Sequence, residues 1–437
     1  MSTADANMIF VATSDLAGLV RGKSFPASEW EKRCERGVGW TPTNVQITCF
    51  DTIADSPFGS LGDLALVPDS GTRFQLGQGA GALDVVLGDI QTLEGVPWEY
   101  CTRAIAKRAL TELHDLCGAS VVSAFEHEFQ LKDVPVRAGD SFGLKGFRDG
   151  QVWAEALLAE LARTSCKPDT FMKEYGPSQY EVTNKPAQDI TAADNAVILR
   201  ILTDDVLRRH GVAASFSPIL DPESVGNGVH IHFSFVGDDG EPLTHDASDP
   251  HGMSTLTRHF IGGVLEHLNQ ILALLAPSAI SYLRLTPHRW SAAFNNLGYR
   301  DREASVRICP VSARDSDAIA RQFNFEVRAV DAAASPYLAF AAIVFAGSHG
   351  IRHQIEPPAP TQEDLSLLSS DELAKRGFKR LPQSLEEALA ALDGSKAVRD
   401  WFGSDFVDVY IAHKKGELQH LEGRDWTGKC NLYKEIY

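Results

Sequence analysis

The 437-residue sequence predicts an α+β protein, in which a small β-rich unit precedes a larger unit of alternating strands and helices. Residues 45–90 alternate short apolar runs with Gly, Asp and Pro, a pattern typical of short strands joined by turns. From residue 98 onward apolar residues recur at helical spacing, first along 98–117, and strand and helix patterns then alternate. We expect a boundary near residue 95. The two units are then residues 1–95 and residues 96–437.

Individual elements follow from the same patterns. Residues 8–26 contain two apolar runs around a turn and predict a β-hairpin. Helical spacing predicts helices over 192–210, 255–275 and 332–350. The polar, proline-rich segment 352–383 predicts a long surface loop. Ser384 and Glu387 predict a capping box at the start of the helix that follows this loop.

Composition excludes several classes of protein. Asp and Glu number 58 against 41 Lys and Arg, which gives a net charge of −17, and no basic stripe is present, so we expect no nucleic-acid partner. No apolar run approaches the ~18 residues of a membrane span, and the first residues lack the basic region of a signal peptide. Seven cysteines without a CxxC motif predict reduced thiols and a cytoplasmic protein. The acidic excess fits either cation binding or solubility alone.

The segment VVSAFEHEFQL (121–131) predicts a strand that carries two carboxylates on one face. Glu126 and Glu128 are two residues apart, which places them ~7 Å apart on that face. This spacing is too long for a shared proton but suits contacts with two different cations. The alternative is an ordinary solvent-facing strand.

A second pair of carboxylates flanks a predicted turn. Glu174 and Glu181 lie on either side of the Gly-Pro turn in FMKEYGPSQYEVTN (171–184). A turn allows two carboxylates to converge, although solvent-facing side chains would give the same pattern.

The segment GNGVHIHFSF (226–235) predicts a strand with one polar and one apolar face. His230, His232 and Ser234 share one face, whereas the residues between them are all apolar. Imidazole ligates divalent metals and also binds polar ligands. A hydrogen-bonded core histidine is the alternative for either residue.

A final cluster combines an acid with several arginines. Glu326 and Arg328 share a strand face in FNFEVRAVDAA (323–333). The preceding segments are rich in arginine, at Arg284, Arg300, Arg302 and Arg307. Guanidinium groups match carboxylate and phosphate, and carboxylates with a histidine match divalent cations. Together these residue types favour metal-assisted phosphoryl transfer from a nucleotide to a carboxylate.

The order of these segments resembles the glutamine synthetase family. The matching motifs are FEHEF, two glutamates seven positions apart that end in QYEV, GNGVHIHFSF, RLTP, REASVRI and FEVRAVDAAASPYLAFAAIVFAG, with DLAGLVRGK and CFDTIADSPFGSLGDLALVPD nearer the N-terminus. They cover nearly the whole chain. The resemblance implies a β-grasp N-terminal domain and a catalytic domain with a curved antiparallel sheet flanked by helices. It also implies a ring-shaped homo-oligomer, commonly a dodecamer, in which a neighbour's N-terminal domain completes each site.

The resemblance also implies roles for individual residues. One Mg²⁺ or Mn²⁺ is expected at Glu128, Glu174 and Glu181, and a second, which bridges the ATP phosphates, at Glu126, His230 and Glu326. ATP contacts are expected at His232, Ser234, Arg302, Arg307 and Arg321, and glutamate contacts at Gly226, Arg284 and Arg328. The expected catalytic residues are Asp51, which holds and deprotonates the incoming nitrogen, Arg302 and Glu326.

Departures from the family pattern point to the amine. Trp290 stands where ammonia-using members carry a glutamate that takes a proton from the attacking nitrogen. Val225 replaces an asparagine and Asn324 replaces an arginine of the pattern. An indole disfavours ammonium and favours a primary amine with an alkyl or aryl group, unless Trp290 faces away from the site. Trp290 and Asp51 are thus expected to line an amine pocket.

The predicted reaction is ATP-dependent ligation of the glutamate γ-carboxylate to a primary amine through γ-glutamyl phosphate, as the first step of amine catabolism. One alternative is an ammonia-using glutamine synthetase. Another is a catalytically inactive scaffold or regulator, against which the six intact metal-ligand positions argue.

Overall fold

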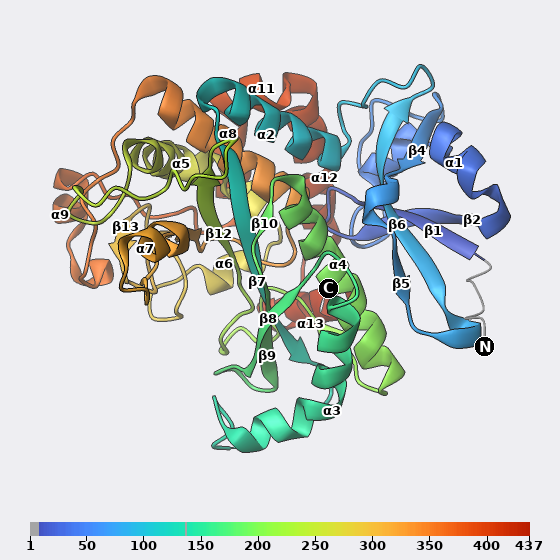
Figure 1. Cartoon of the computed structure of the whole chain (residues 1–437), viewed down its shortest axis with the longest axis horizontal. Helices are drawn as coiled ribbons and strands as arrows, with labels where there is room; N and C mark the ends of the chain where they lie inside the picture. The colour runs from blue at the N-terminus through green and yellow to red at the C-terminus, as the bar shows by residue number, and fades with distance from the viewer. Residues whose placement is uncertain (1–7, 136–137) are drawn as a thin grey trace.

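Two β-sheets organise residues 8–135 and 138–437, which are the part of the chain that the computed structural model describes (Figure 1). The smaller sheet, at the right of Figure 1, has the strand order β2-β1-β6-β4-β3, with β5 paired to β6. Its strands are β1 (Met8–Ser14), β2 (Val20–Pro26), β3 (Val38–Trp40), β4 (Leu64–Pro68), β5 (Phe74–Leu76) and β6 (Leu83–Thr92). The helix α1 (Trp30–Arg36) packs against β4.

The hairpin expected over residues 8–26 is confirmed, since β1 and β2 pair antiparallel from Met8↔Pro26 to Ser14↔Val20. The Asp15 carboxylate fixes the turn, because it accepts the backbone N–H groups of Ala17 (2.9 Å) and Leu19 (2.8 Å). The same carboxylate accepts Arg21 Nε at 2.8 Å.

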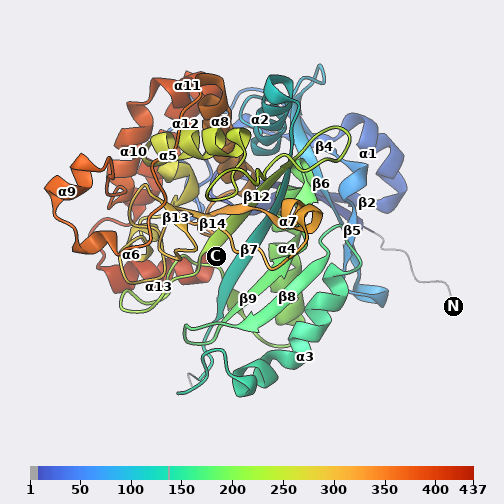
Figure 2. The same ribbon diagram turned by 60° about the vertical axis from the view of Figure 1, so that its left-hand side comes forward.

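The larger sheet has the order β13-β14-β15-β12-β7-β9-β8, with β10 and β11 paired to β7 (Figure 2). Its strands are β7 (Ser120–Leu131), β8 (Pro168–Lys173), β9 (Gln179–Asn184), β10 (Ala187–Gln188), β11 (Ala214–Ser215), β12 (Val229–Val236), β13 (Leu297–Tyr299), β14 (Val306–Ile308) and β15 (Phe325–Val327). All described pairs are antiparallel except β13–β14. The predicted α+β fold class with a curved antiparallel sheet is confirmed.

The helices are α2 (Thr102–Cys117), α3 (Leu144–Leu161), α4 (Ile190–Arg209), α5 (Thr255–Leu275), α6 (Ser281–Arg284), α7 (Ser316–Gln322), α8 (Pro336–His353), α9 (Ser370–Lys375), α10 (Leu385–Asp393), α11 (Lys396–Phe402), α12 (Ser404–His420) and α13 (Trp426–Ile436). The helix expected over 255–275 has the predicted bounds, and the one expected over 192–210 is shifted by one or two residues. The helix expected from residue 332 begins at Pro336, because proline fits the first helical position.

The prediction of a loop over 352–383 is wrong in part, because this segment contains the helix α9. That helix begins with a complete capping box of Ser369 and Glu372. The box expected at Ser384 is only half formed. The Ser384 hydroxyl accepts the Glu387 N–H at 3.2 Å, but the Glu387 carboxylate accepts the N–H of Gln383 instead.

The apolar face of the large sheet packs on α5 and α8. Phe233 on β12 lies 5.7 Å from Phe325 on β15, 5.8 Å from Phe260 on α5 and 5.6 Å from Phe340 on α8, measured between ring centroids. Phe125 on β7 is 5.8 Å from Phe340. Since side chains alternate along a strand, this packing turns the polar residues of the same strands to the opposite face.

A close contact of two glycines brings α5 and α8 together. A Cβ atom on Gly263 would lie 2.2 Å from the carbonyl oxygen of Ala346, and one on Gly350 would lie 2.1 Å from that of His259. Any larger residue at either position would push the helices apart. The contact therefore fixes which side chains of α5 and α8 meet on either side of it.

A buried arginine joins the small sheet to the helices. Arg103 on α2 is 1% exposed and donates to Asp194 on α4 (two contacts of 2.8 Å), to Asp69 after β4 (2.8 Å) and to Asp89 on β6 (3.1 Å). The Tyr337 hydroxyl also donates to Asp194, at 2.7 Å. One guanidinium group thus satisfies carboxylates from both parts of the chain.

Arg103→Met is expected to lower the free energy of unfolding by about 3–5 kcal/mol, because it leaves buried carboxylates without their counter-charge. Urea denaturation measures this loss. Lys107→Met is the matched control, since Lys107 also pairs with Asp89 (2.6 Å) but is partly exposed and should contribute less than about 1 kcal/mol. Equal losses in the two variants would contradict the role assigned to Arg103.

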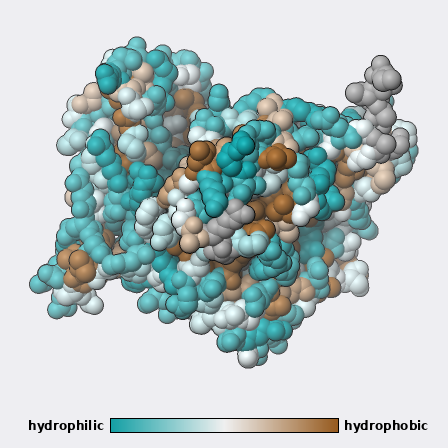
Figure 3. All heavy atoms as spheres, turned by 90° about the horizontal axis from the view of Figure 1, so that it is seen from below, coloured by the Kyte–Doolittle hydropathy of each residue, from teal (hydrophilic) through white to brown (hydrophobic). Residues whose placement is uncertain are grey.

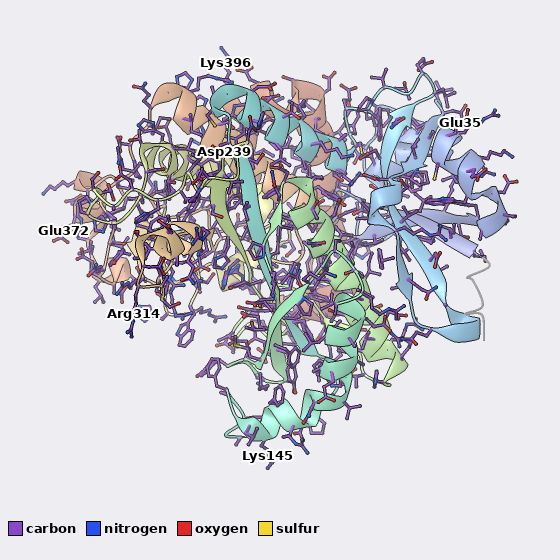
Figure 4. The ribbon with its side chains drawn as sticks, in the orientation of Figure 1. Glu35, Lys145, Asp239, Arg314, Glu372 and Lys396 are labelled. Atoms are coloured by element: carbon purple, nitrogen blue, oxygen red, sulfur yellow. The ribbon has the colours of Figure 1, made fainter. Side chains whose placement is uncertain are left out.

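The surface is largely hydrophilic on the side seen in Figure 3, with scattered hydrophobic patches. Figure 4 places the labelled residues Glu35, Lys145 and Glu372 at the periphery of the molecule. Within the described ranges, no helix combines the length and apolar character needed to cross a membrane.

Candidate active site

Four neighbouring strands, β14, β15, β12 and β7, bring the predicted polar residues together on one face of the large sheet. His230 on β12 lies directly opposite Glu126 on β7, and His232 lies opposite Glu326 on β15. Arg307 on β14 lies on the other side of Glu326. The period-two faces read from the sequence are therefore confirmed, and the register places all five side chains in one cluster.

The predicted second metal set has ligand-like geometry. One ligand atom each of Glu126, His230 and Glu326 lies within 4.8 Å of the others. Carboxylate oxygens with one imidazole nitrogen suit Mg²⁺ or Mn²⁺, so the residues present fit a divalent cation. His232 lies at the same place, because its Nε2 is 3.0 Å from Glu126 Oε1 and 3.1 Å from Glu326 Oε2.

Two arginines hold Glu326, which is 1% exposed. Arg307 Nη1 donates to its Oε1 at 2.7 Å, and Arg328 Nη1 donates to the same oxygen at 2.8 Å. Burial would raise the pKa of Glu326, but the charge of Arg328 and the hydrogen bond with His232 hold it well below its usual range. Glu326 is therefore a fixed anion at the centre of the cluster.

The pKa values of the two histidines shift in opposite directions. Burial and the charge of Arg328 lower the pKa of His230 to about 4. Burial would also lower the pKa of His232, but the charge of Glu126 and the hydrogen bonds with Cys309, Glu126 and Glu326 raise it well above its usual value. The shift at His230 favours the neutral imidazole, the form that ligates metals, whereas the shift at His232 favours the protonated ring beside its carboxylates.

The predicted first metal set is less closely gathered. Glu128 on β7 lies opposite Glu181 on β9, and Glu174 lies in the turn after β8. Among the described residues, however, the ligand atoms of these three do not all lie within 4.8 Å of one another. The Glu174 carboxylate accepts the N–H of Tyr175 (2.9 Å), so a rotation of its side chain is needed before the three could share a cation.

These carboxylates repel one another. Burial raises the pKa of Glu128 to about 7, with a further contribution from Glu174. Burial and then the charges of Glu126 and Glu128 raise the pKa of Glu181 well above its usual value. Buried, crowded carboxylates of this kind are stabilised by a bound divalent cation.

Beside this set lies a cavity of about 220 Å³. It is lined by Glu128, Glu174, Tyr175, Gln179, Val225, Gly226, Gly228, His230, Arg284, His288, Arg289, Trp290 and Ser291. Arg284 is 2% exposed and is held by Ser291 Oγ (2.6 Å) and the carbonyl oxygens of Arg328 and Val330. A Cβ atom on Gly226 would lie 2.7 Å from the Arg284 side chain, so only glycine leaves this wall in place. The predicted glutamate-binding residues Gly226 and Arg284 thus meet at one cavity.

Trp290 faces this cavity and stacks on Tyr175, with ring centroids 6.0 Å apart and planes 22° apart. Trp290 and His288 also line a second cavity of about 720 Å³, so their loop separates the two. Four carboxyl side chains line that outer cavity: Asp301, Glu303, Glu363 and Asp364. Trp290 thus lines both cavities although it is 57% exposed, and its expected place at an amine pocket stays a prediction.

Glu303 holds the Trp290 loop in an unusual conformation. Both His288 and Trp290 have positive backbone φ angles, 64° and 52°, which residues other than glycine rarely adopt. Glu303 Oε2 accepts the N–H of His288 and its Oε1 accepts the N–H of Trp290, both at 3.2 Å. The Trp290 carbonyl accepts Arg328 Nη2 at 3.3 Å. The loop is thus fixed at its backbone from both sides.

Other predicted site residues lie outside this cluster. The Arg302 and Arg321 side chains are exposed, although the Arg302 carbonyl accepts Arg328 Nε at 3.0 Å. Ser234 donates to the carbonyl of Val122 (3.3 Å). Asp51 lies in the N-terminal part, has an 82% exposed side chain paired with Arg21 (3.1 Å), and lines neither of the two cavities described above.

Several residues of the site were not singled out from the sequence. Gln179 donates to Glu128 Oε2 (3.2 Å), the Gly226 carbonyl and Asn227 Oδ1 (both 2.9 Å), so it links the first predicted ligand set to the glycine-rich turn. It lies two residues before Glu181 on the same strand face, and this spacing could have indicated it. Tyr175 and Glu303 carried no comparable signal.

Comparison with known proteins agrees with this geometry. The family model for the glutamine synthetase N-terminal domain matches residues 2–98, and that for the glutamine synthetase catalytic domain matches residues 99–429. The chain therefore belongs to the glutamine synthetase family. It is an ATP-dependent carbon–nitrogen ligase, and members of this family use glutamate, ATP, divalent metals and an amine or ammonia.

Relatives of known activity differ in the nitrogen donor. The chain is 33% identical to gamma-glutamylpolyamine synthetase GlnA3 of Streptomyces coelicolor, over 98% of this chain and 93% of the relative. It is 29% identical to glutamine synthetase of Pyrococcus furiosus (95% and 91% covered) and 28% identical to glutamate–methylamine ligase of Methyloversatilis universalis (97% and 95%). A solved structure of a novel glutamine synthase homolog matches with a TM-score of 0.91 and 38% identity over the full length of both chains.

Proposed function

We propose that this ligase joins the γ-carboxylate of glutamate to a primary amine that carries an alkyl or aryl group. The observation that carries the proposal is the stacked pair of Trp290 and Tyr175 at the wall of the cavity that contains Arg284. Aromatic rings bind apolar groups well and offer no counter-charge to a small ammonium ion. Such an amine would enter past the pair, with the glutamate held by Arg284, Arg328 and the backbone at Gly226.

The reaction has two balanced steps. An oxygen of the glutamate γ-carboxylate attacks the γ-phosphorus of ATP, the bond to the bridging oxygen breaks, and ADP leaves. The amine nitrogen then attacks the acyl carbon of γ-glutamyl phosphate, loses a proton to a base, and phosphate leaves. Two divalent cations, held by Glu128, Glu174 and Glu181 and by Glu126, His230 and Glu326, would neutralise charge on the phosphates. Arg307 would stabilise the transferred phosphoryl group.

The remaining base is Asp51, which we propose acts in the site of a neighbouring subunit. Its carboxylate is exposed and lines neither of the two cavities beside Trp290, as expected of a residue that completes another site. Ile53 and Leu61, in the same segment, are 65% and 77% exposed, so apolar surface lies near Asp51 for a neighbouring subunit to cover. A ring-shaped homo-oligomer satisfies both observations.

A phosphate-release assay with glutamate, ATP and Mg²⁺ tests the proposal against a panel of amines. Release that is faster with alkylamines or anilines than with ammonia supports it. Turnover with ammonia alone would identify an ammonia-using glutamine synthetase, and no turnover with any nitrogen donor would identify a scaffold or regulator.

A diamine or polyamine is a second candidate. The outer cavity beside Trp290 carries four carboxylates, which could receive the distal ammonium of a long amine. The relative from Streptomyces coelicolor, a gamma-glutamylpolyamine synthetase, also supports this candidate. Diamines of increasing chain length, compared with monoamines of equal length in the same assay, separate the two candidates.

Glu303→Ala is expected to lower kcat/KM for the amine by about tenfold, because it removes both carboxylate contacts that fix the loop bearing Trp290. The KM for glutamate should change little. Glu363→Ala is the matched control, since Glu363 lines the same outer cavity but pairs with Arg376 instead (2.6 Å). A similar loss in both variants would show that cavity charge, and not loop position, is responsible.

A further inference from the structure

A cluster of histidines lies between α5 and α8, on the side of these helices that faces α11. The His267 ring on α5 is 4.7 Å from that of His349 on α8, which is 4.3 Å from that of His353 one turn further along. Trp401 on α11 lies 4.9 Å from His267 and 5.6 Å from His349. Glu266 is the neighbouring carboxylate, with Oε1 3.9 Å from His267 Nε2. None of these residues belongs to the catalytic cluster.

The glycine contact of the two helices explains why the rings meet. Gly263 lies one helical turn before His267, and Gly350 directly follows His349. Because the two helix backbones touch at these glycines, side chains of α5 and α8 that lie within one turn of the contact are held close to one another. His349 and His353 are four residues apart and therefore share a face of α8. The imidazoles are thus preorganised by the backbone.

His267 has unused hydrogen-bonding capacity. It is 8% exposed, and neither of its ring nitrogens has a hydrogen-bond partner among the described residues. A buried polar atom without a partner costs about 1–3 kcal/mol, so such atoms in proteins usually meet a water or an ion. One nitrogen of His267, one carboxylate oxygen of Glu266 and one nitrogen of His349 all lie within 4.8 Å of one another.

We propose that Glu266, His267 and His349 bind a divalent transition-metal ion such as Zn²⁺, with His353 available as a fourth ligand. Imidazole nitrogens with one carboxylate match Zn²⁺, Co²⁺ or Ni²⁺, whereas Mg²⁺ prefers oxygen ligands. The site therefore differs in ligand chemistry from the catalytic cluster, which is dominated by carboxylates. A small adjustment of rotamers brings ligand atoms 4.8 Å apart to the spacing of a tetrahedral site.

The electrostatics agree with this geometry. Burial and the charges of His349 and His353 lower the pKa of His267 to about 4. Burial, His353 and Arg352 lower the pKa of His349, against the opposite effect of Glu266. Neutral imidazoles keep the lone pair that a metal requires, so at neutral pH His267 needs no loss of a proton before it binds.

A bound ion would link α5 to α8 beside Trp401. Because a ligand that binds only the folded state stabilises it in proportion to its occupancy, the melting temperature should rise with the concentration of the ion. None of the four residues lines either cavity or belongs to the ligand set of Glu126, His230 and Glu326, so the Mg²⁺-dependent ligase reaction should not require this ion.

Cobalt binding to the full-length protein tests the proposal. The protein is stripped with a chelator, saturated with Mg²⁺ and titrated with Co²⁺, whose visible absorption reports tetrahedral nitrogen ligation. One Co²⁺ per chain is expected. His349→Phe, which keeps an aromatic ring beside Trp401 but removes both nitrogens, should weaken binding by more than about 100-fold and abolish the ion-dependent rise in melting temperature. Its ligase activity with Mg²⁺ should remain that of the unaltered protein.

His259→Phe is the matched control, since His259 lies on the same helix and pairs with Glu356 (3.1 Å) outside the cluster. It should bind Co²⁺ normally. His353→Ala, at an exposed position, should weaken binding even if His349→Phe does not fold. Three results would overturn the proposal: no Co²⁺ spectrum, an unchanged spectrum in both cluster variants, or a spectrum that disappears in Glu326→Gln. The first would leave the cluster as aromatic packing around Trp401, and the last would place the ion in the catalytic site.

Discussion

Glu326→Gln is expected to lower the rate of phosphate release by about three orders of magnitude or more. Glu326 contacts His232, Arg307 and Arg328 at the same time. It also belongs to the set with ligand atoms within 4.8 Å of Glu126 and His230. A divalent cation stabilises a phosphoryl-transfer transition state by several kcal/mol, and each 1.36 kcal/mol changes the rate about tenfold. The neutral amide would weaken both the cation and the arginine contacts.

The same substitution also removes a buried charge, so stability has to be separated from activity. Glu417→Gln is the matched control, because Glu417 is fully buried and pairs with Lys414 (2.9 Å) away from the catalytic cluster. Both variants should unfold at a lower urea concentration than the unaltered protein, since each leaves a buried cation unpaired. Only Glu326→Gln should require more Mg²⁺ for half-maximal activity. An unchanged Mg²⁺ requirement with lost activity would assign Glu326 to arginine positioning alone.

The strand residues of the site could be predicted because the period of a strand is local. In β12 and β15 every second residue is an apolar side chain of the core, and on β7 the buried face alternates with Glu126, so the positions of Glu126, His230 and Glu326 on the opposite face followed from the sequence. That these strands are neighbours did not follow from periodicity. It came from the family resemblance, and the register of the sheet then aligned the residues.

The loop residues could not be predicted in the same way. The contact of Tyr175 with Trp290 joins two loops that are more than one hundred residues apart, and no periodicity links them. The two contacts from Glu303 depend on positive φ angles at His288 and Trp290, which neither residue type favours. Glu303 would have been interpreted as a solvent-facing acid within an arginine-rich segment.

Asp51 illustrates a different limit. The sequence motif assigned it a role in the active site, but within one chain its carboxylate pairs with Arg21 and lies in the N-terminal part. It has a positive φ angle of 55°, and its side chain is 82% exposed. Pairwise geometry within a chain cannot bring such a residue to the cluster, so its role depends on the proposed contact between subunits.

Trp290→Glu is expected to switch the preferred nitrogen donor, as measured by kcat/KM, from apolar amines to ammonia. Loss of the indole removes the apolar surface against which an aryl amine would be buried. Burial of such a group stabilises the bound state by about 1.5–3 kcal/mol, so kcat/KM for an aryl amine should fall about 10–100-fold. The new carboxylate would lie between the two cavities, where it could hold a small cation and accept its proton. The assay measures kcat/KM for ammonia and for aniline-type amines under identical conditions.

Two further variants show whether the indole itself sets this preference. Trp290→Phe keeps an apolar ring at the same position and should keep most of the activity with apolar amines. Trp426→Glu changes an exposed tryptophan on α13 that lines neither cavity. It should leave kcat/KM for ammonia and for apolar amines unchanged. If Trp290→Glu and Trp290→Phe lost amine activity equally and neither gained activity with ammonia, the contribution of Trp290 would lie in the conformation of its loop. The choice of nitrogen donor would then depend on the four carboxylates of the outer cavity, and diamines would become the expected substrates.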